Sequence, residues 1–231
     1  CQCEGWGAGG VDKFGRQFHG YANASSGISN VTVKSFTFDL TSIESITTIN
    51  DSAGNPALEV KHVYGPSPIA TDTLFEVTIS ITNIAGYKIT DVRYNRSMDW
   101  DIPPSEFSEV VSAVGVDASV ATGKLPRVLM SGNNGFMRPN PFNSAGSHNR
   151  GKGTGDFERH GPMDHGFTGT FGFGELLCGE NHNFISYYGA AESRPALEAA
   201  LASESIPLYS IGESSPVEGS SVSYAWGFKG V

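Results

Sequence analysis

The stretch 75–104, FEVTISITNIAGYKITDVRYNRSMDWDIPP, decides the fold class of this 231-residue chain. Its first eight residues alternate apolar and polar side chains, and the apolar ones share one face: Phe75, Val77, Ile79 and Ile81. This period of two is that of a half-buried β-strand. After the turn-rich residues 83–86, a second alternating run points Val92, Tyr94 and Met98 to one side. The stretch therefore predicts a β-hairpin.

Other alternating runs predict further strands of the same kind. They lie at residues 58–64, 167–173, 183–188 and 222–228. In residues 31–38 the apolar side chains change phase between Val33 and Phe36, so a β-bulge near Lys34 is needed if both ends of this strand are to face one core. Many short strands separated by turn residues predict an all-β fold, an antiparallel β-sandwich of Ig-like or jelly-roll-like type.

One short helix and one long loop interrupt the strands. Residues 193–201 carry a helix signature, with Ser193 as N-cap, Pro195 in the first turn, and Leu197 and Leu201 on one face. Residues 133–166 are rich in Gly, Asn, Pro and His and follow no period. Loops of this length inside a compact domain are mostly functional or disordered. We therefore expect a functional site in this segment.

Length and composition favour a single domain that spans residues 1–231. Aromatic residues make up 11% of the chain and charged residues only 17%, which is typical of a folded, loop-rich β-protein. The glycine-rich head, residues 1–27, carries spaced aromatic side chains, and we expect it to pack as irregular backbone on the domain. No stretch has the length and apolar character of a membrane-spanning helix.

The formal net charge of the chain is -9 at pH 7. Phosphate backbones and anionic lipid headgroups repel such a chain, so neither nucleic acid nor a membrane surface is an expected partner. A cation or a neutral glycan fits better.

The three cysteines are Cys1, Cys3 and Cys178. Cys1 and Cys3 are too close in sequence for an easy mutual disulfide. We expect Cys178 to pair with Cys3, with Cys1 as the alternative partner, and one thiol to be left over. Three reduced, buried cysteines are the other interpretation. A chain that opens on Cys without an initiator Met looks processed, which favours a secreted protein.

Two passages resemble bacterial secreted β-sandwich domains of surface proteins, adhesins and sorting-signal proteins. They are VTISITNIAGYKITDVRYNRSMDWDIPP at 77–104 and FGFGELLCGENHNFISYYGAA at 171–191. The resemblance implies the sandwich architecture and an extracellular location. It implies no catalytic residues, since such domains serve as spacers, adhesive modules and assembly subunits alike.

Four aspartates are candidate ligands for calcium, which takes oxygen ligands in a flexible geometry. They are Asp99, Asp101, Asp156 and Asp164. The alternative is that the first two cap a turn and the last two are solvated. A zinc site at His160 and His165, with His148 as a third ligand, is less favoured, because the Gly-Pro between the first two breaks any helix.

Aromatic side chains predict a second kind of site, because their faces pack on sugar rings. Trp100, flanked by acids, is expected to be exposed, and it is a candidate binding residue together with Tyr187. A hydrolase would need two facing carboxyls, for which Glu106 and Glu109 offer only a spacing of three within a loop.

The sequence favours an extracellular structural or adhesive subunit that associates with copies of itself or with a matrix, into filaments or a surface layer. The last alternating run is the expected contact, since Tyr224, Trp226 and Phe228 could enter a partner as a donated strand. The alternative is a calcium-supported carbohydrate-binding module. A secreted hydrolase is the third hypothesis.

Overall fold

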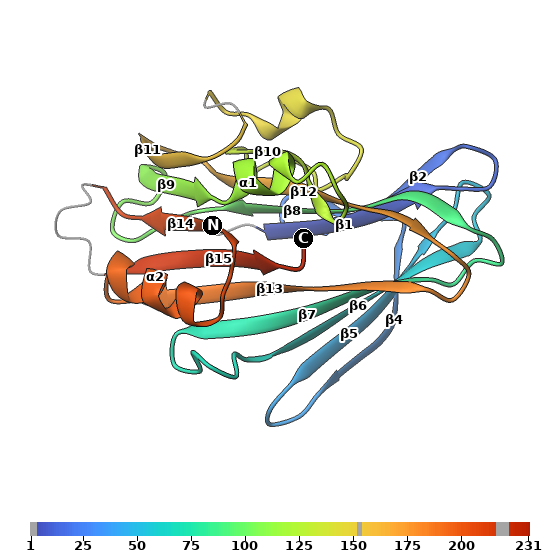
Figure 1. Cartoon of the computed structure of the whole chain (residues 1–231), viewed down its shortest axis with the longest axis horizontal. Coiled ribbons are helices and arrows are strands. Elements are labelled where there is room, and N and C mark those ends of the chain that lie inside the picture. The colour runs from blue at the N-terminus through green and yellow to red at the C-terminus, as the bar shows by residue number, and fades with distance from the viewer. Residues whose placement is uncertain (1–3, 152–153, 216–221) are drawn as a thin grey trace.

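The computed structural model describes residues 4–151, 154–215 and 222–231, and these form two antiparallel β-sheets packed face to face (Figure 1). The six-stranded sheet has the order β10-β12-β8-β1-β2-β3, and the nine-stranded sheet has the order β11-β9-β14-β15-β13-β7-β6-β5-β4. The all-β antiparallel sandwich expected from the sequence is thus confirmed.

The strands of the six-stranded sheet are β1 Glu4–Val11, β2 Gln17–Asn23, β3 Gly27–Ser29, β8 Ile89–Asp99, β10 Arg127–Gly132 and β12 Gly166–Leu176. Those of the nine-stranded sheet are β4 Val31–Phe38, β5 Ile43–Asn50, β6 Pro56–Pro66, β7 Leu74–Asn83, β9 Glu109–Val114, β11 Phe157–Met163, β13 Asn181–Ala191, β14 Leu208–Glu213 and β15 Ser223–Lys229. The helices are α1 Val116–Ala121, the 3-10 helix η1 Ala145–His148 and α2 Arg194–Ser203.

Aromatic rings from both sheets fill the space between them. Phe171 of β12 lies 4.9 Å from Phe228 of β15, measured between ring centroids, and Trp226 lies at the same distance from Phe228. Tyr94 of β8 meets Phe184 of β13 edge to face at 5.0 Å. Such large rings contribute most of the buried apolar area of a core.

The predicted hairpin at 75–104 is wrong, although both of its strands exist. β7 pairs with β6 and β13 in one sheet, whereas β8 pairs with β1 and β12 in the other, so the chain crosses between the sheets at residues 84–88. The buried amide of Asn83 holds this crossing, since its Nδ2 donates to the carbonyls of Tyr87 and Leu176. The apolar faces of both strands still meet in one core. The period of two therefore predicted the buried face of each strand, but it did not predict which strands pair.

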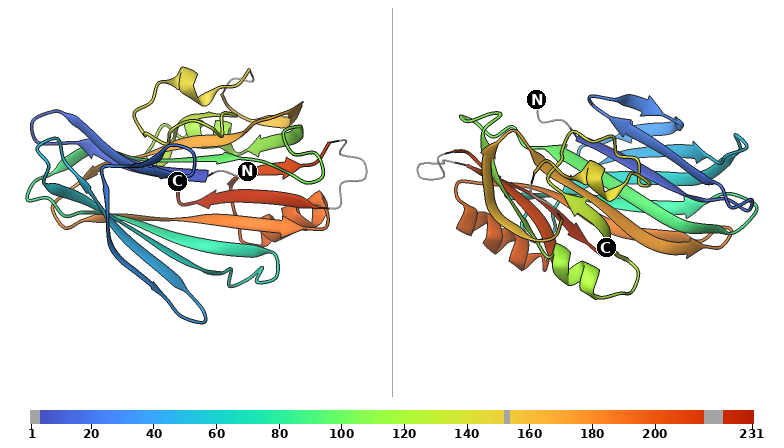
Figure 2. Two further views of the ribbon diagram at one scale, coloured as in Figure 1. Left: turned by 180° about the vertical axis from the view of Figure 1, so that it is seen from behind. Right: turned by 90° about the horizontal axis from the view of Figure 1, so that it is seen from above.

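The bulge predicted in residues 31–38 is confirmed, because the register between β4 and β5 shifts between Val33 and Ser35. The expected burial is wrong. β4 is the edge strand of the larger sheet, and its hairpin with β5 projects beyond the smaller sheet (Figures 1 and 2). Val33 and Phe36 are each 62% exposed and Phe38 is 77% exposed, because no strand of the opposite sheet covers them.

The head of the chain is regular rather than irregular. β1 and β2 form an antiparallel hairpin, and β1 also pairs with β8 in the middle of the six-stranded sheet. Its glycines leave room for other parts of the chain. A Cβ added at Gly7 would lie 1.9 Å from the carbonyl oxygen of Pro139, so the long loop comes into backbone contact with this strand.

The helix predicted at 193–201 is confirmed as α2. The Ser193 Oγ accepts a hydrogen bond from Ala196 N, and Leu197 and Leu201 are buried against the outer face of the nine-stranded sheet. Tyr187 lies in the same apolar cluster and is buried. Stacking on a sugar needs an exposed ring face, so the binding role expected for Tyr187 is not supported by its position.

The last strand does not offer the uncovered edge that we expected. β15 lies between β14 and β13 and pairs with both, and Trp226 and Phe228 are fully buried in the core of their own chain. Tyr224 is half-buried beside them. Donation of this strand to a neighbour would open the sandwich, so the strand cannot be the self-association contact of the folded domain.

The described parts of the long segment, residues 133–151 and 154–166, cover the outer face of the six-stranded sheet and contribute β11 to the other sheet (Figures 1 and 2). Side-chain hydrogen bonds, rather than an apolar stripe, hold this segment. Asn133 Nδ2 donates to the carbonyl of Arg150, and the N–H of Arg150 donates to Asn133 Oδ1 at 2.7 Å. The imidazole of His148 is fully buried and bonds to Thr170 Oγ1 of β12.

Cys178 is an exposed free thiol among the described residues, and Cys1 and Cys3 lie outside them. The predicted disulfide between Cys178 and Cys3, or Cys1 as the alternative, therefore stays a prediction. No helix in the described part of the chain is long and apolar enough to cross a membrane.

The contact at Gly7 gives a first prediction. Gly7→Ala should push the Pro139 backbone off β1, lower the free energy of unfolding by about 1–3 kcal/mol and increase proteolytic cleavage within residues 133–150. Gly86→Ala is the matched control, because nothing lies within 4 Å of a Cβ there. Denaturant unfolding and limited proteolysis measure both effects. Equal behaviour of the two variants would contradict the backbone contact.

Candidate metal centre

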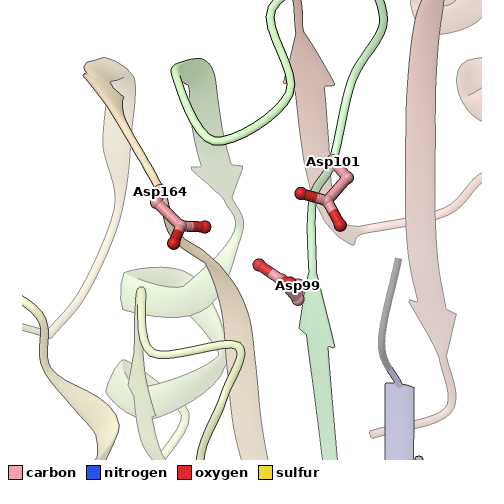
Figure 3. A group of neighbouring side chains, drawn as sticks. All are labelled: Asp99, Asp101 and Asp164. Carbon is pink, nitrogen blue, oxygen red and sulfur yellow. The ribbon is translucent and has the colours of Figure 1, made fainter. Parts of the chain in front are cut away.

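Three aspartates gather where β8 ends and the chain turns from β11 into β12. Asp99 and Asp101 come from the end of β8, and Asp164 comes from the turn (Figure 3). One carboxylate oxygen of each lies within 4.8 Å of the others. In Figure 3 the three side chains point into a common space from two segments of the chain.

Strand alternation sends Asp99 and Asp101 to one side of the chain and the residue between them to the other. The Trp100 ring turns toward the core, where its Nε1 donates to Ser210 Oγ of β14 at 3.1 Å. Asp99 lies opposite Gly166 in the pairing of β8 with β12. A Cβ at Gly166 would lie 1.8 Å from the Met98 carbonyl oxygen, so glycine is required for this close approach.

The turn that carries Asp164 is fixed by its neighbour His165. The N–H of His165 donates to Glu109 Oε1 of β9 at 2.8 Å, and its carbonyl accepts from the Trp100 N–H at 3.2 Å. The Asn133 amide Nδ2 lies 3.3 Å from the ring Nδ1 of His165. Strand β9, the end of β8 and the end of β10 therefore hold the turn from three sides.

The site is strongly acidic and largely out of water. Asp99 is only 2% exposed, and burial, followed by the charges of Asp101, Asp164 and Glu109, raises its pKa to about 7. Burial is likewise the main cause that raises the pKa of Glu109 to about 7. Burial and the neighbouring His160 lower the pKa of His165 to about 4, so its imidazole is neutral at pH 7.

Several oxygens of the site have no hydrogen-bond partner among the described residues. They are Asp99 Oδ1, Glu109 Oε2 and Asp164 Oδ1. These three acids also form no ion pair with a lysine, arginine or histidine in that part of the chain. Buried carboxylates are normally paired or bound to a metal, because an isolated buried charge is costly. The Asp99, Asp101 and Asp164 group can therefore hold a metal ion.

The fourth predicted ligand, Asp156, is not part of the site. It is exposed, and its Oδ1 accepts hydrogen bonds from the backbone N–H groups of Val116 and Asp117 at the start of α1. The zinc triad also does not form as a unit. The His160 and His165 rings lie 5.5 Å apart, but His148 bonds to Thr170 and to the carbonyl of Ser144.

Sequence reasoning missed Glu109 as a member of this site. A signal was present, since Glu109 opens the apolar run EVVSAV, where a charged residue at a strand start needs a partner. The expected exposure of Trp100 is wrong, because this side chain is only 2% exposed. Its ring nevertheless lines a cavity between the two sheets, so a binding role for Trp100 stays a prediction.

Comparisons with known proteins leave the family open. No family model matches the chain, and no curated protein matches it. Among solved structures, a galactose mutarotase related enzyme from Lactobacillus acidophilus is similar, with 13% sequence identity and a TM-score of 0.30. The match covers 94% of this chain and 65% of that one. A likeness at this level carries no argument about function.

The raised pKa of Asp99 gives a second prediction. Its carboxyl holds a proton up to about pH 7 in the folded protein but only to about 3.8 in the unfolded chain, so without metal its ionisation destabilises the fold as pH rises between these values. Asp99→Asn removes this penalty.

Melting temperatures are measured in the presence of a chelator. The melting temperature of Asp99→Asn minus that of the unsubstituted protein should be at least about 3 °C larger at pH 8 than at pH 5. The histidines of low pKa affect the pH dependence of stability equally in both proteins, so their effect cancels in this difference. A difference that is constant with pH would show that Asp99 ionises normally in the folded state.

Proposed function

We propose that this protein is an extracellular, calcium-supported module that binds glycan. The observation that carries the proposal is the convergence of the carboxylates of Asp99, Asp101 and Asp164 beside the buried Glu109, with Asp99 Oδ1 and Asp164 Oδ1 lacking a hydrogen-bond partner among the described residues. A bound cation would compensate these charges. It would also join the end of β8 to the turn before β12, two segments that frame one end of the sandwich.

The donor set favours calcium over other metals. Carboxylate oxygens suit hard cations, whereas zinc and copper prefer the thiolate and imidazole ligands that this group lacks. Oxygens separated by up to 4.8 Å fit on opposite sides of a calcium ion, whose oxygen ligands lie at about 2.3–2.6 Å. Backbone carbonyls and water would complete its six to eight ligands.

Calcium binding is the third prediction. Titration calorimetry should find one calcium site, with a dissociation constant of about 10⁻³ M or tighter, as in other extracellular modules. Asp99→Asn and Asp164→Asn should each weaken it at least about tenfold, because each removes one charged ligand. Asp117→Asn, at an exposed acid on α1, is the control that should bind as before. Absence of binding at 10 mM calcium, a concentration about ten times the weakest expected constant, would refute the proposal.

Self-association is the second candidate function, and the edge strand β4 favours it. Val33, Phe36 and Phe38 share its exposed apolar face, and Leu40 in the following turn is fully exposed. The outer edge of β4 has no neighbouring strand in the described sheet. An apolar edge strand is a template for pairing with another strand, and two copies related by a two-fold axis could pair their β4 strands antiparallel.

The fourth prediction tests this contact. Sedimentation velocity should show association that increases with protein concentration. The double variant Phe36→Lys/Phe38→Lys should weaken it more than about tenfold, since each phenylalanine buries apolar area worth about 1.5–3 kcal/mol. Phe14→Lys makes one such substitution at an exposed phenylalanine in the β1–β2 turn and should leave association unchanged. A monomer at every concentration would rule out assembly through β4.

A further inference from the structure

A cavity of about 460 Å³ opens between the two sheets at the end of the sandwich where β8 stops. One wall is the inner side of β8, with Trp100 and its neighbour Met98. The other wall is the inner face of the nine-stranded sheet, where Phe75 of β7 lies opposite Tyr188 of β13. Tyr224 of β15 continues this wall, so aromatic side chains from three adjacent strands line one side of the cavity.

A fixed carboxylate lies at the edge of the aromatic wall. Glu4 Oε1 accepts a hydrogen bond from Arg96 Nη2 at 2.9 Å, and Glu4 Oε2 accepts one from the Tyr188 hydroxyl at 2.5 Å. The guanidinium of Arg96 is fully buried and also contacts the Tyr94 hydroxyl, so this network holds Glu4 in one position. Each carboxylate oxygen has a second lone pair, so Glu4 can accept further hydrogen bonds from a ligand.

The opposite rim is also rich in acceptors. Thr71, Asp72 and Thr73 line it, and they precede β7 directly. The carbonyl of Thr73 accepts from the Ala190 N–H at 3.1 Å, which ties this segment to β13. The cavity thus combines an apolar aromatic wall with hydrogen-bond acceptors at both of its edges.

We infer that this cavity binds a pyranose ring of a neutral glycan. The apolar face of the ring packs on Phe75 and Tyr188, and its hydroxyls donate to the carboxylates of Glu4 and Asp72. Arg96 neutralises Glu4, which weakens the attraction of the site for an organic cation and favours an uncharged polyol. The volume lies in the usual range of about 300–1,000 Å³ for small-ligand sites. The inference rests on the proposed function in that it gives the module its ligand.

The cavity and the cation site share one strand end. Met98 and Trp100 face the cavity, whereas Asp99 and Asp101 face the candidate cation. Calcium that fixes the two aspartates also fixes the backbone from which the cavity side chains project. The ligand should therefore be tested with calcium present.

The experiment titrates the full chain, in calcium, with methyl pyranosides of gluco, galacto, manno and xylo configuration and follows backbone amide NMR shifts. One or more sugars should give saturable shifts at Gly189, Ala190 and Ala225, which line the cavity. Phe75→Ala should weaken that sugar at least about tenfold, since it removes an exposed ring from the wall. Phe14→Ala removes a similarly exposed ring from the β1–β2 turn, at the end of β1 away from Glu4, and should bind the sugar unchanged.

Three results would overturn the inference. They are the absence of shifts with every sugar, equal affinity of Phe75→Ala and the unsubstituted protein, and tighter binding of tetramethylammonium than of any sugar. The two proposals fail separately. Sugar binding without calcium binding would leave the cavity assignment standing and remove the cation, whereas calcium binding without any sugar shift would remove the cavity assignment alone.

Discussion

The burial of acidic side chains beside the end of β8 is the constraint on which this end of the molecule depends. Asp99 and Glu109 are almost completely removed from water, with Asp101 and Asp164 close by. Like charges in a low-dielectric setting repel strongly, so protons or positive charge must compensate Asp99 and Glu109. The raised pKa values describe the first state, and the proposed calcium site describes the second.

Strand β8 is buried on both faces, and the charged side chains on the two faces differ in their partners. On the inner face Arg96 lies fully buried between the sheets, where it pairs with Glu4 and lies 5.1 Å from the ring centroid of Trp226. On the outer face, under the segment 133–166, Asp99 has no such partner among the described residues. The contrast between an arginine with an ion-pair partner and an aspartate that has none in the described part of the chain is the main physical argument for a cation.

Much of the fold could be predicted from alternation, because a period of two reports the burial of one strand face directly. The strands at 58–64 and 222–228 and the bulge near Lys34 follow from this pattern. The pattern does not show which strands pair, since a hairpin and a crossing between sheets use the same turn residues. Residues 83–86 therefore predicted a hairpin where the chain changes sheet.

The candidate site was predictable only in part. Asp99 and Asp101 stand two residues apart at a strand end, so their common side follows from the sequence. The same alternation places Trp100 on the opposite, buried side, although acids flank it in the sequence. The local sequence does not distinguish Asp164 from Asp156 as a ligand, since both lie in the same glycine-rich segment. The pairing of β11 with β9 and of β12 with β8 places Asp164 in the candidate site and Asp156 at the start of α1.

The most direct test of the account is anomalous X-ray scattering from crystals grown in calcium. We expect an anomalous peak among Asp99, Asp101 and Asp164, with carboxylate oxygens at about 2.3–2.6 Å from it. A map without a peak there, with the carboxyls bonded to one another or to water, would contradict the claim that a cation compensates the buried acids.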